Sequence, residues 1–119
     1  MSARRHELHL LTGAYATDAL DAAERAEFER KLQAEGYTEL FDRHMEASGT
    51  GPEHSHEFDA LLFVLKGEMT IACIGRPETF RAGDLCSVPA GTPHTEQFGS
   101  GSAGVHYLAA WRYPAGRKV

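Results

Sequence analysis

The chain has 119 residues, a length typical of one compact domain. Hydrophobic residues make up 42% of it and charged residues 24%, the ordinary mix of a globular protein. Its 12 Lys and Arg residues against 17 Asp and Glu residues give a formal charge of −5, which disfavours nucleic-acid binding. Because no apolar run reaches about 18 residues, we also expect no membrane span.

Two features favour a cytoplasmic location. The segment Met1–Glu7 is not followed by the apolar stretch of a secretory signal. The two cysteines, Cys73 and Cys86, have twelve residues between them, a spacing that matches neither a disulfide framework nor a zinc motif. We therefore expect two buried thiols in a reducing cytoplasm.

The first third of the chain is predicted to be helical. Leucines are frequent over residues 8–15, and residues 22–35 are rich in the helix formers Ala, Glu, Arg and Lys. Phe28 and Leu32 lie four apart, so they would form one apolar stripe that docks on a core. Gly36 follows where a left-handed helix end is expected.

From residue 37 onward the pattern changes to short apolar strands separated by turns rich in Gly and Pro. The predicted strands are residues 37–47, 58–65, 69–74, 78–81, 85–88 and 105–111. Short strands at such regular spacing are typical of a sandwich or barrel. We therefore divide the chain into a helical extension, residues 1–36, and a β-barrel domain, residues 37–119.

Three histidines are predicted to converge at one point of this β domain. His54 and His56 are two residues apart, which places both imidazoles on the same side of an extended chain. In the segment Gly83–His94, a strand ends in a Pro/Gly turn that returns His94 towards the interior. Converging imidazoles suit metal chelation.

Both segments resemble the signature motifs of the cupin superfamily, G-x5-H-x-H-x3,4-E-x6-G and G-x5-P-x-G-x2-H-x3-N. The positions that match are Gly67, which closes the first motif, and Gly83, Pro89, Gly91 and His94 of the second, with His54 and His56 as the H-x-H pair. The resemblance covers residues 37–112. It implies an all-β jelly-roll barrel with one or two N-terminal helices packed outside, and His54, His56 and His94 as metal ligands.

The chain departs from these motifs at the metal-binding Glu. Ala60 or, at the longer spacing, Leu61 stands in its place, and neither side chain can bind a metal. Phe98 likewise replaces the final Asn. Three interpretations stay open: a three-His site like that of the thiol dioxygenases, a β-bulge that turns Asp59 inward as a ligand, or a barrel that has lost its metal and binds an organic molecule.

Further candidates lie close to these motifs. Glu96 and Gln97 follow His94, as an additional ligand or as partners of the metal-bound imidazoles. His44, His106 and Tyr107 lie on strands that are expected to line the barrel, so they are candidate pocket residues.

The resemblance implies one divalent transition metal ion, with Fe, Zn, Ni, Mn and Cu all open, because imidazole accepts several metals. Our leading hypothesis is a metal-dependent enzyme that acts on a small molecule. A three-His Fe(II) dioxygenase is one chemistry that this hypothesis includes. The alternative is a non-catalytic sensor or small-ligand-binding module. The resemblance also implies a homodimer through exposed barrel strands, which elution as a monomer at high concentration would contradict.

Overall fold

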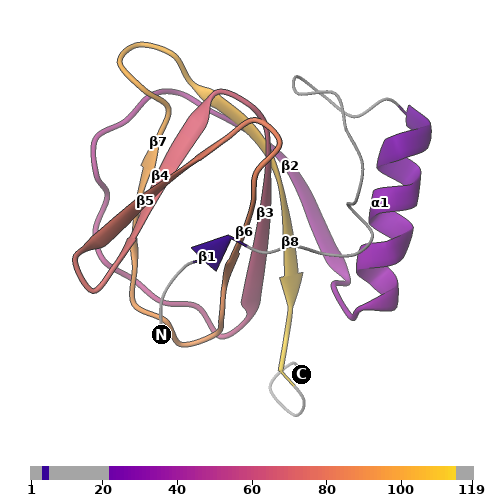
Figure 1. Ribbon diagram of the computed structural model, residues 1–119. Helices are drawn as coiled ribbons and strands as arrows, with labels where there is room; N and C mark the ends of the chain where they lie inside the picture. The colour runs from indigo at the N-terminus through magenta and orange to yellow at the C-terminus, as the bar shows by residue number, and fades with distance from the viewer. Residues whose placement is uncertain (1–3, 6–21, 115–119) are drawn as a thin grey trace.

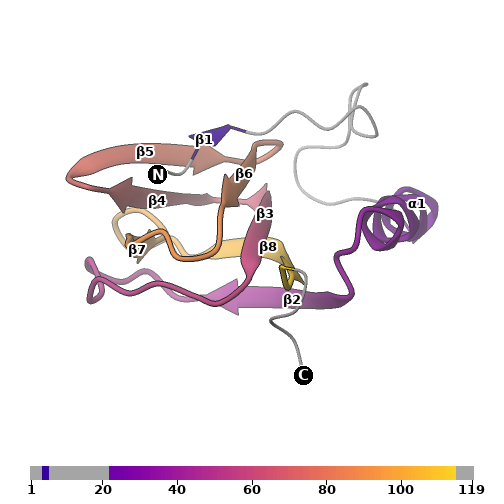
Figure 2. The same ribbon diagram turned by 90° about the horizontal axis from the view of Figure 1, so that it is seen from below.

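The computed structural model describes residues 4–5 and 22–114. In chain order the elements are β1 (Arg4–Arg5), α1 (Ala22–Ala34), β2 (Glu39–Met45), β3 (Asp59–Lys66), β4 (Glu68–Cys73), β5 (Arg76–Arg81), β6 (Leu85–Val88), β7 (Thr95–Phe98) and β8 (Val105–Arg112). One sheet has five strands in the order β1-β6-β3-β8-β2, and the other has three in the order β5-β4-β7. Figures 1 and 2 show the two sheets facing each other, with α1 outside the larger one.

This arrangement confirms the predicted all-β jelly roll with a helix outside it. All the strand pairs are antiparallel. Over the described residues the ladders form two separate sheets, so the fold is a jelly-roll sandwich and not a continuously hydrogen-bonded barrel. No helix in this part of the chain is long and apolar enough to cross a membrane.

The N-terminal third differs from the prediction in one respect. The helix over residues 22–34 is present, but Arg4–Arg5 form a short strand that pairs with β6. The helix expected around residues 8–15 lies outside the described residues.

Strand β7 was also not predicted, because its sequence, Thr-Glu-Gln-Phe, has neither an apolar run nor a clear alternation.

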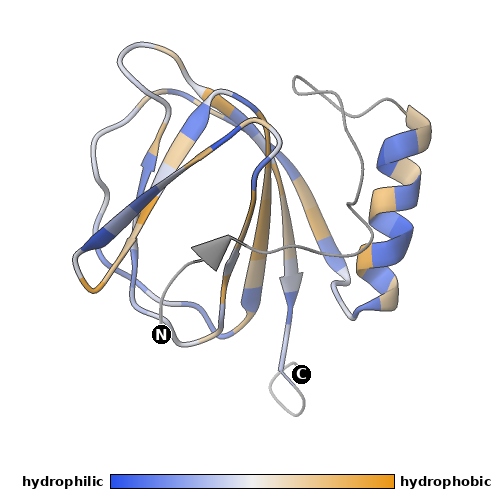
Figure 3. Cartoon of the chain, in the orientation of Figure 1, coloured by the Kyte–Doolittle hydropathy of each residue, from blue (hydrophilic) through white to orange (hydrophobic). Residues whose placement is uncertain are grey.

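Strand β3 is apolar along almost its whole length because both of its faces are covered. Leu62 and Val64 point into the space between the two sheets. Leu61, Phe63 and Leu65 point the other way, towards α1. Strand β4 has only one covered face, so its buried residues alternate with half-buried ones. Figure 3 shows the apolar character of β3 in the middle of the molecule.

Helix α1 is attached to the outer face of the five-stranded sheet by the predicted stripe. Phe28 and Leu32 are 2% and 1% exposed, and the Phe28 ring lies 5.3 Å from that of Phe63. Helix α1 ends at Ala34, and Gly36 follows with a φ of 94°, the left-handed conformation that glycine adopts without strain. Tyr37 then turns back into the same apolar layer, where it is buried.

Replacing Phe28 with Ala should therefore lower the free energy of unfolding by about 3 kcal/mol or more, since it leaves a cavity between helix and sheet. Urea unfolding followed by circular dichroism measures this change. Gln33→Ala, on the exposed side of the same helix, is the matched control and should shift stability by less than about 0.5 kcal/mol. Equal stabilities for the two variants would contradict the docking of α1.

Candidate metal centre

The loop between β2 and β3 runs antiparallel to residues 91–98 and is hydrogen-bonded to them. Backbone amides of Ser48 and Gly51 donate to the carbonyls of Phe98 and Glu96, at 2.9 and 3.0 Å. His54 and His94 then exchange two backbone hydrogen bonds, each of 2.9 Å. The loop thus serves as an additional strand beside β7, and it brings two distant histidines face to face.

This pairing brings together the three histidines that the motifs single out. The ring centroids of His54 and His94 lie 4.5 Å apart, and His56 lies 4.8 Å from the first ring and 5.2 Å from the second. A hydrogen bond of 2.8 Å from the Gly91 amide to the His56 carbonyl holds the Pro/Gly turn against the same loop. Gly91 has a φ of 80°, so the turn requires a residue that tolerates this conformation.

Backbone carbonyls fix the orientation of two of these rings. The Nδ1 atom of His54 donates to the Pro52 carbonyl at 2.9 Å, and Nδ1 of His94 donates to the Thr92 carbonyl at 2.8 Å. With the proton on Nδ1, the neutral ring presents its Nε2 lone pair on the opposite side. Metal-binding histidines are generally held in this way by their second nitrogen.

Glu96 supplies a carboxylate to the same point. It follows His94 by two residues on β7, so both side chains lie on one side of the strand. Its Oε2 atom is 3.4 Å from Nε2 of His94 and 3.9 Å from Nε2 of His54. We call His54, His56, His94 and Glu96 the histidine–glutamate centre; one potential ligand atom of each residue lies within 4.8 Å of the others.

The donor set of this centre fits a divalent transition metal. The Glu96 carboxylate lies close to the Nε2 atoms of two imidazoles, an arrangement that a cation between them would stabilise. Donors about 2.1 Å from one ion lie roughly 3.0–3.4 Å apart at neighbouring positions, close to the Glu96–His94 separation. Imidazole and carboxylate together are suitable for Fe, Mn, Ni, Zn or Cu.

The titration behaviour of the centre follows from this geometry. Burial alone would lower the pKa of His94, but the hydrogen bond to Glu96 and the Thr92 carbonyl together raise it above its usual value. Burial would raise the pKa of Glu96, whereas the hydrogen bond to His94 and the neighbouring imidazolium charges lower it. Burial and the charges of His54 and His94 lower the pKa of His56. In the absence of metal, Glu96 and His94 therefore stabilise each other's charged form.

A cavity of about 300 Å³ opens beside the centre, between the two sheets. His56, His94 and Glu96 form part of its wall. The remaining lining is Arg43, Phe58, Ala60, Leu62, Val88, Phe98, Tyr107, Ala109 and Trp111. A mostly apolar pocket with a few converging polar groups is the usual form of a small-molecule site.

The hypothesis that Asp59 turns inward as a metal ligand is wrong. Its Oδ1 atom accepts a hydrogen bond from the Ala90 amide at 2.9 Å. Its Oδ2 atom is 3.1 Å from Nη2 of Arg112, in an ion pair that holds the carboxylate away from the histidines. Asp59 therefore supports the Pro/Gly turn, and the carboxylate that faces the histidines is that of Glu96.

Two predicted pocket residues lie on the opposite face of the sheet. His44 and His106 are stacked at 3.7 Å on the outer face of β2 and β8, with Asp42 accepting a hydrogen bond of 2.7 Å from Nε2 of His106. We call Asp42, His44 and His106 the outer cluster. It lies beside α1, where Arg25 binds Asp42. His44 and His106 are thus pocket residues of a hollow of about 660 Å³ on this outer side, and the expectation that they line the interior is corrected, whereas Tyr107 does line the interior cavity.

Gln97 also lies away from the centre. It follows Glu96 and points to the other side of β7, where its Oε1 atom is 3.4 Å from the Thr50 hydroxyl.

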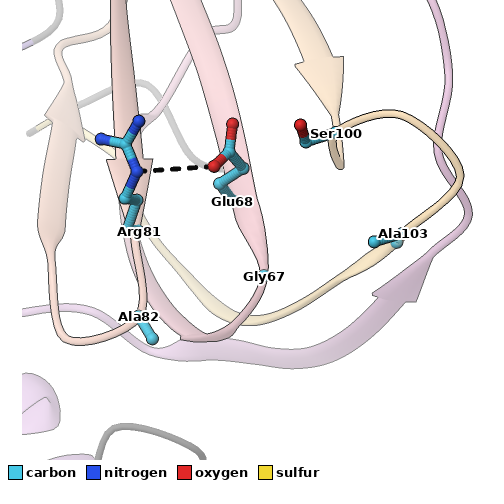
Figure 4. A pocket seen from close by; sticks show the side chains of 7 residues that line it. Gly67, Glu68, Arg81, Ala82, Ser100 and Ala103 are labelled. Atoms are coloured by element: carbon cyan, nitrogen blue, oxygen red, sulfur yellow. Dashed lines mark ion pairs between the residues drawn. The ribbon is translucent and has the colours of Figure 1, made fainter.

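A separate hollow of about 330 Å³ lies at the ends of β4 and β5 (Figure 4). Its charged side chains, Arg81 and Glu68, are 3.4 Å apart and neutralise each other, so the hollow presents no unpaired charge.

Comparison with known proteins agrees with this architecture. Residues 41–109 match the family described as Cupin domain, more than half of the chain. The chain therefore belongs to the cupin family. No curated protein is similar enough to match it.

Solved structures show the same fold at low sequence identity. A cupin protein from Bacteroides fragilis is 20% identical with a TM-score of 0.54, over 67% of this chain and 69% of that one. An RmlC-like cupin with a double-stranded β-helix fold from Methanocaldococcus jannaschii is 19% identical with a TM-score of 0.54, over 62% and 68%. A predicted oxalate decarboxylase from Thermotoga maritima is 17% identical with a TM-score of 0.57, over 71% and 74%.

Glu96→Gln should lower the pKa of His94 in metal-free protein. The substitution removes the carboxylate that stabilises the charged imidazolium, while the burial that disfavours it remains. Chelator-treated protein titrated by NMR, with the ring protons of each histidine followed, measures the change. Glu57→Gln, at an exposed position nearby, is the matched control. An unchanged His94 pKa in Glu96→Gln would refute the pairing.

Proposed function

We propose that the chain is a metal-dependent cupin enzyme that acts on a small molecule, with one divalent transition metal ion on His54, His56, His94 and Glu96. The observation that supports this most directly is the position of Glu96. Its carboxylate faces the Nε2 atoms of two imidazoles at 3.4 and 3.9 Å, on the wall of a cavity large enough for a small ligand.

Each residue of the centre has a definable part in this proposal. The three imidazoles are neutral ligands, and Glu96 adds one negative charge that stabilises a divalent ion. The Pro52 and Thr92 carbonyls keep His54 and His94 in the required tautomer. When bound, such an ion polarises a substrate oxygen or lowers the pKa of water, and Fe(II) adds oxygen chemistry.

The apolar walls of the cavity would then exclude water from a bound substrate. Phe58 and Trp111 are stacked with ring centroids 4.0 Å apart, and His56 is stacked on Phe58 at 4.7 Å. This row of rings extends from the ligand His56 into the cavity. Substrate placed against it lies next to the ion, where the low dielectric strengthens the attraction between the two.

The carboxylate also bears on the choice among the chemistries open from the sequence. Because Glu96 faces the histidines, the geometry favours a ligand set of three His and one Glu over a three-His site like that of the thiol dioxygenases. The alternative function, a non-catalytic binding or sensor module, draws support from the apolar lining. The two functions differ in whether the ion keeps a coordination position open to the cavity.

Elemental analysis of protein purified without chelator or histidine tag, and after reconstitution, should give about one ion per chain. His54→Ala/His94→Ala should abolish it, because two of four ligands are lost. His44→Ala/His106→Ala removes two imidazoles of the outer cluster and is the matched control, which should keep the ion. An ion-free native protein, or equal loss in both variants, would refute the proposed centre.

Cobalt-loaded protein distinguishes an enzyme from a binding module. If coordination positions face the cavity, added azide should bind the ion and change the visible absorption spectrum of Co(II). A spectrum that does not respond to azide would indicate a closed ion and would favour the non-catalytic alternative. Leu62→Phe, which adds volume to the cavity wall, should weaken the azide response without removing the ion.

A further inference from the structure

The cavity has a positively charged side that the metal ligands do not explain. Among the described residues that line it, Arg43 is the only lysine or arginine. It lies on β2 with the same parity as Phe41 and Met45, which pack against the inner core. Arg43 thus belongs to the face of β2 that looks towards the cavity.

Neighbouring side chains place the guanidinium at the cavity. Its Cζ atom lies 5.6 Å from the centroid of the Phe41 ring, and that ring packs on Trp111 with centroids 4.5 Å apart. Arg43 is paired in register with Tyr107 of β8. Burial raises the pKa of Tyr107, whereas the charge of Arg43 and a hydrogen bond from its guanidinium oppose this, so the Tyr107 hydroxyl lies against the cation.

Arg43 also has no carboxylate partner within 4.0 Å among the residues that the structure describes. By contrast, Arg25 and Arg112 form ion pairs with Asp42 and Asp59, respectively, which neutralise their charges. Apart from its hydrogen bond to Tyr107, the guanidinium of Arg43 therefore has donors left with which arginine binds a carboxylate at two points.

We propose that the ligand of this cavity is a small carboxylate, bound through its anionic group by Arg43 and the Tyr107 hydroxyl, with its other end at the histidine–glutamate centre. The inference rests on the proposed function, since it names the substrate class of that site. A divalent ion on three neutral imidazoles and one carboxylate leaves one net positive charge, and Arg43 adds a second. A carboxylate complements this charge, whereas a neutral or cationic ligand does not.

The single tryptophan of the chain, Trp111, lies in the cavity wall and provides a direct readout. Zinc-loaded protein is titrated with malonate and with malonamide, its uncharged analogue, at constant ionic strength, and Trp111 fluorescence is recorded. Malonate should bind at least tenfold more tightly than malonamide. Equal affinities for the two would overturn the proposal.

Arg43→Gln tests whether this preference comes from Arg43 or from the metal alone. Loss of a charge-assisted pair should weaken malonate binding by about 10- to 100-fold and leave malonamide unchanged. Arg76→Gln removes the same charge from an exposed position on β5 and is the matched control, with affinity close to wild type. Tyr107→Phe should weaken malonate several-fold. If Arg43→Gln behaves like Arg76→Gln, the proposal is wrong.

Metal-free protein separates this inference from the proposed function. If the ion is absent from the centre but the carboxylate site exists, malonate affinity will be the same with and without zinc and will still fall in Arg43→Gln. If the ion binds but no carboxylate site exists, zinc loading will succeed while the preference for malonate over malonamide does not depend on Arg43.

Discussion

The site depends on the pair of backbone hydrogen bonds between His54 and His94. They join the loop between β2 and β3 to the turn before β7, and each bond is 2.9 Å long. Because the bridge fixes both main chains, the two imidazoles need only their Nδ1 bonds to Pro52 and Thr92 to point at one spot. Ligands placed by backbone pairing lose little conformational freedom on binding an ion, which favours affinity. His56 and Glu96 follow from the same bridge, since each lies two residues along from one of the bridged histidines.

A second set of contacts keeps this bridge in place. Asp59 accepts from the Ala90 amide and pairs with Arg112, and the Nη1 atom of Arg112 donates to the Glu35 carbonyl at 3.1 Å. The turn that delivers His94 is thereby connected to the end of α1. The guanidinium also covers the Tyr37 ring, 4.6 Å from its centroid. The helix thus supports the site from outside the sandwich, although none of its residues lines the cavity.

Much of this fold could be predicted from the sequence, because its strands have strong local patterns. The apolar run of β3 and the Pro/Gly turn before His94 are signals that neighbouring residues carry. The place of the carboxylate is different. The family motif directs attention to Ala60, whereas Glu96 reaches the site only because the loop pairs with β7, a contact between residues far apart in sequence. The sequence left the role of Asp59 open for the same reason, since its partner Arg112 lies 53 residues away. His44 has the parity opposite to that of Phe41, and the core on the Phe41 side decides which face of β2 looks inward.

A crystal structure of zinc-loaded protein, with diffraction data on both sides of the zinc absorption edge, tests the central claim most directly. The account predicts one strong anomalous peak about 2.0–2.2 Å from a ring nitrogen of each of the three histidines and from a carboxylate oxygen of Glu96. A peak at the outer cluster of Asp42, His44 and His106 instead, or a bound ion from which Glu96 has turned away, would contradict it.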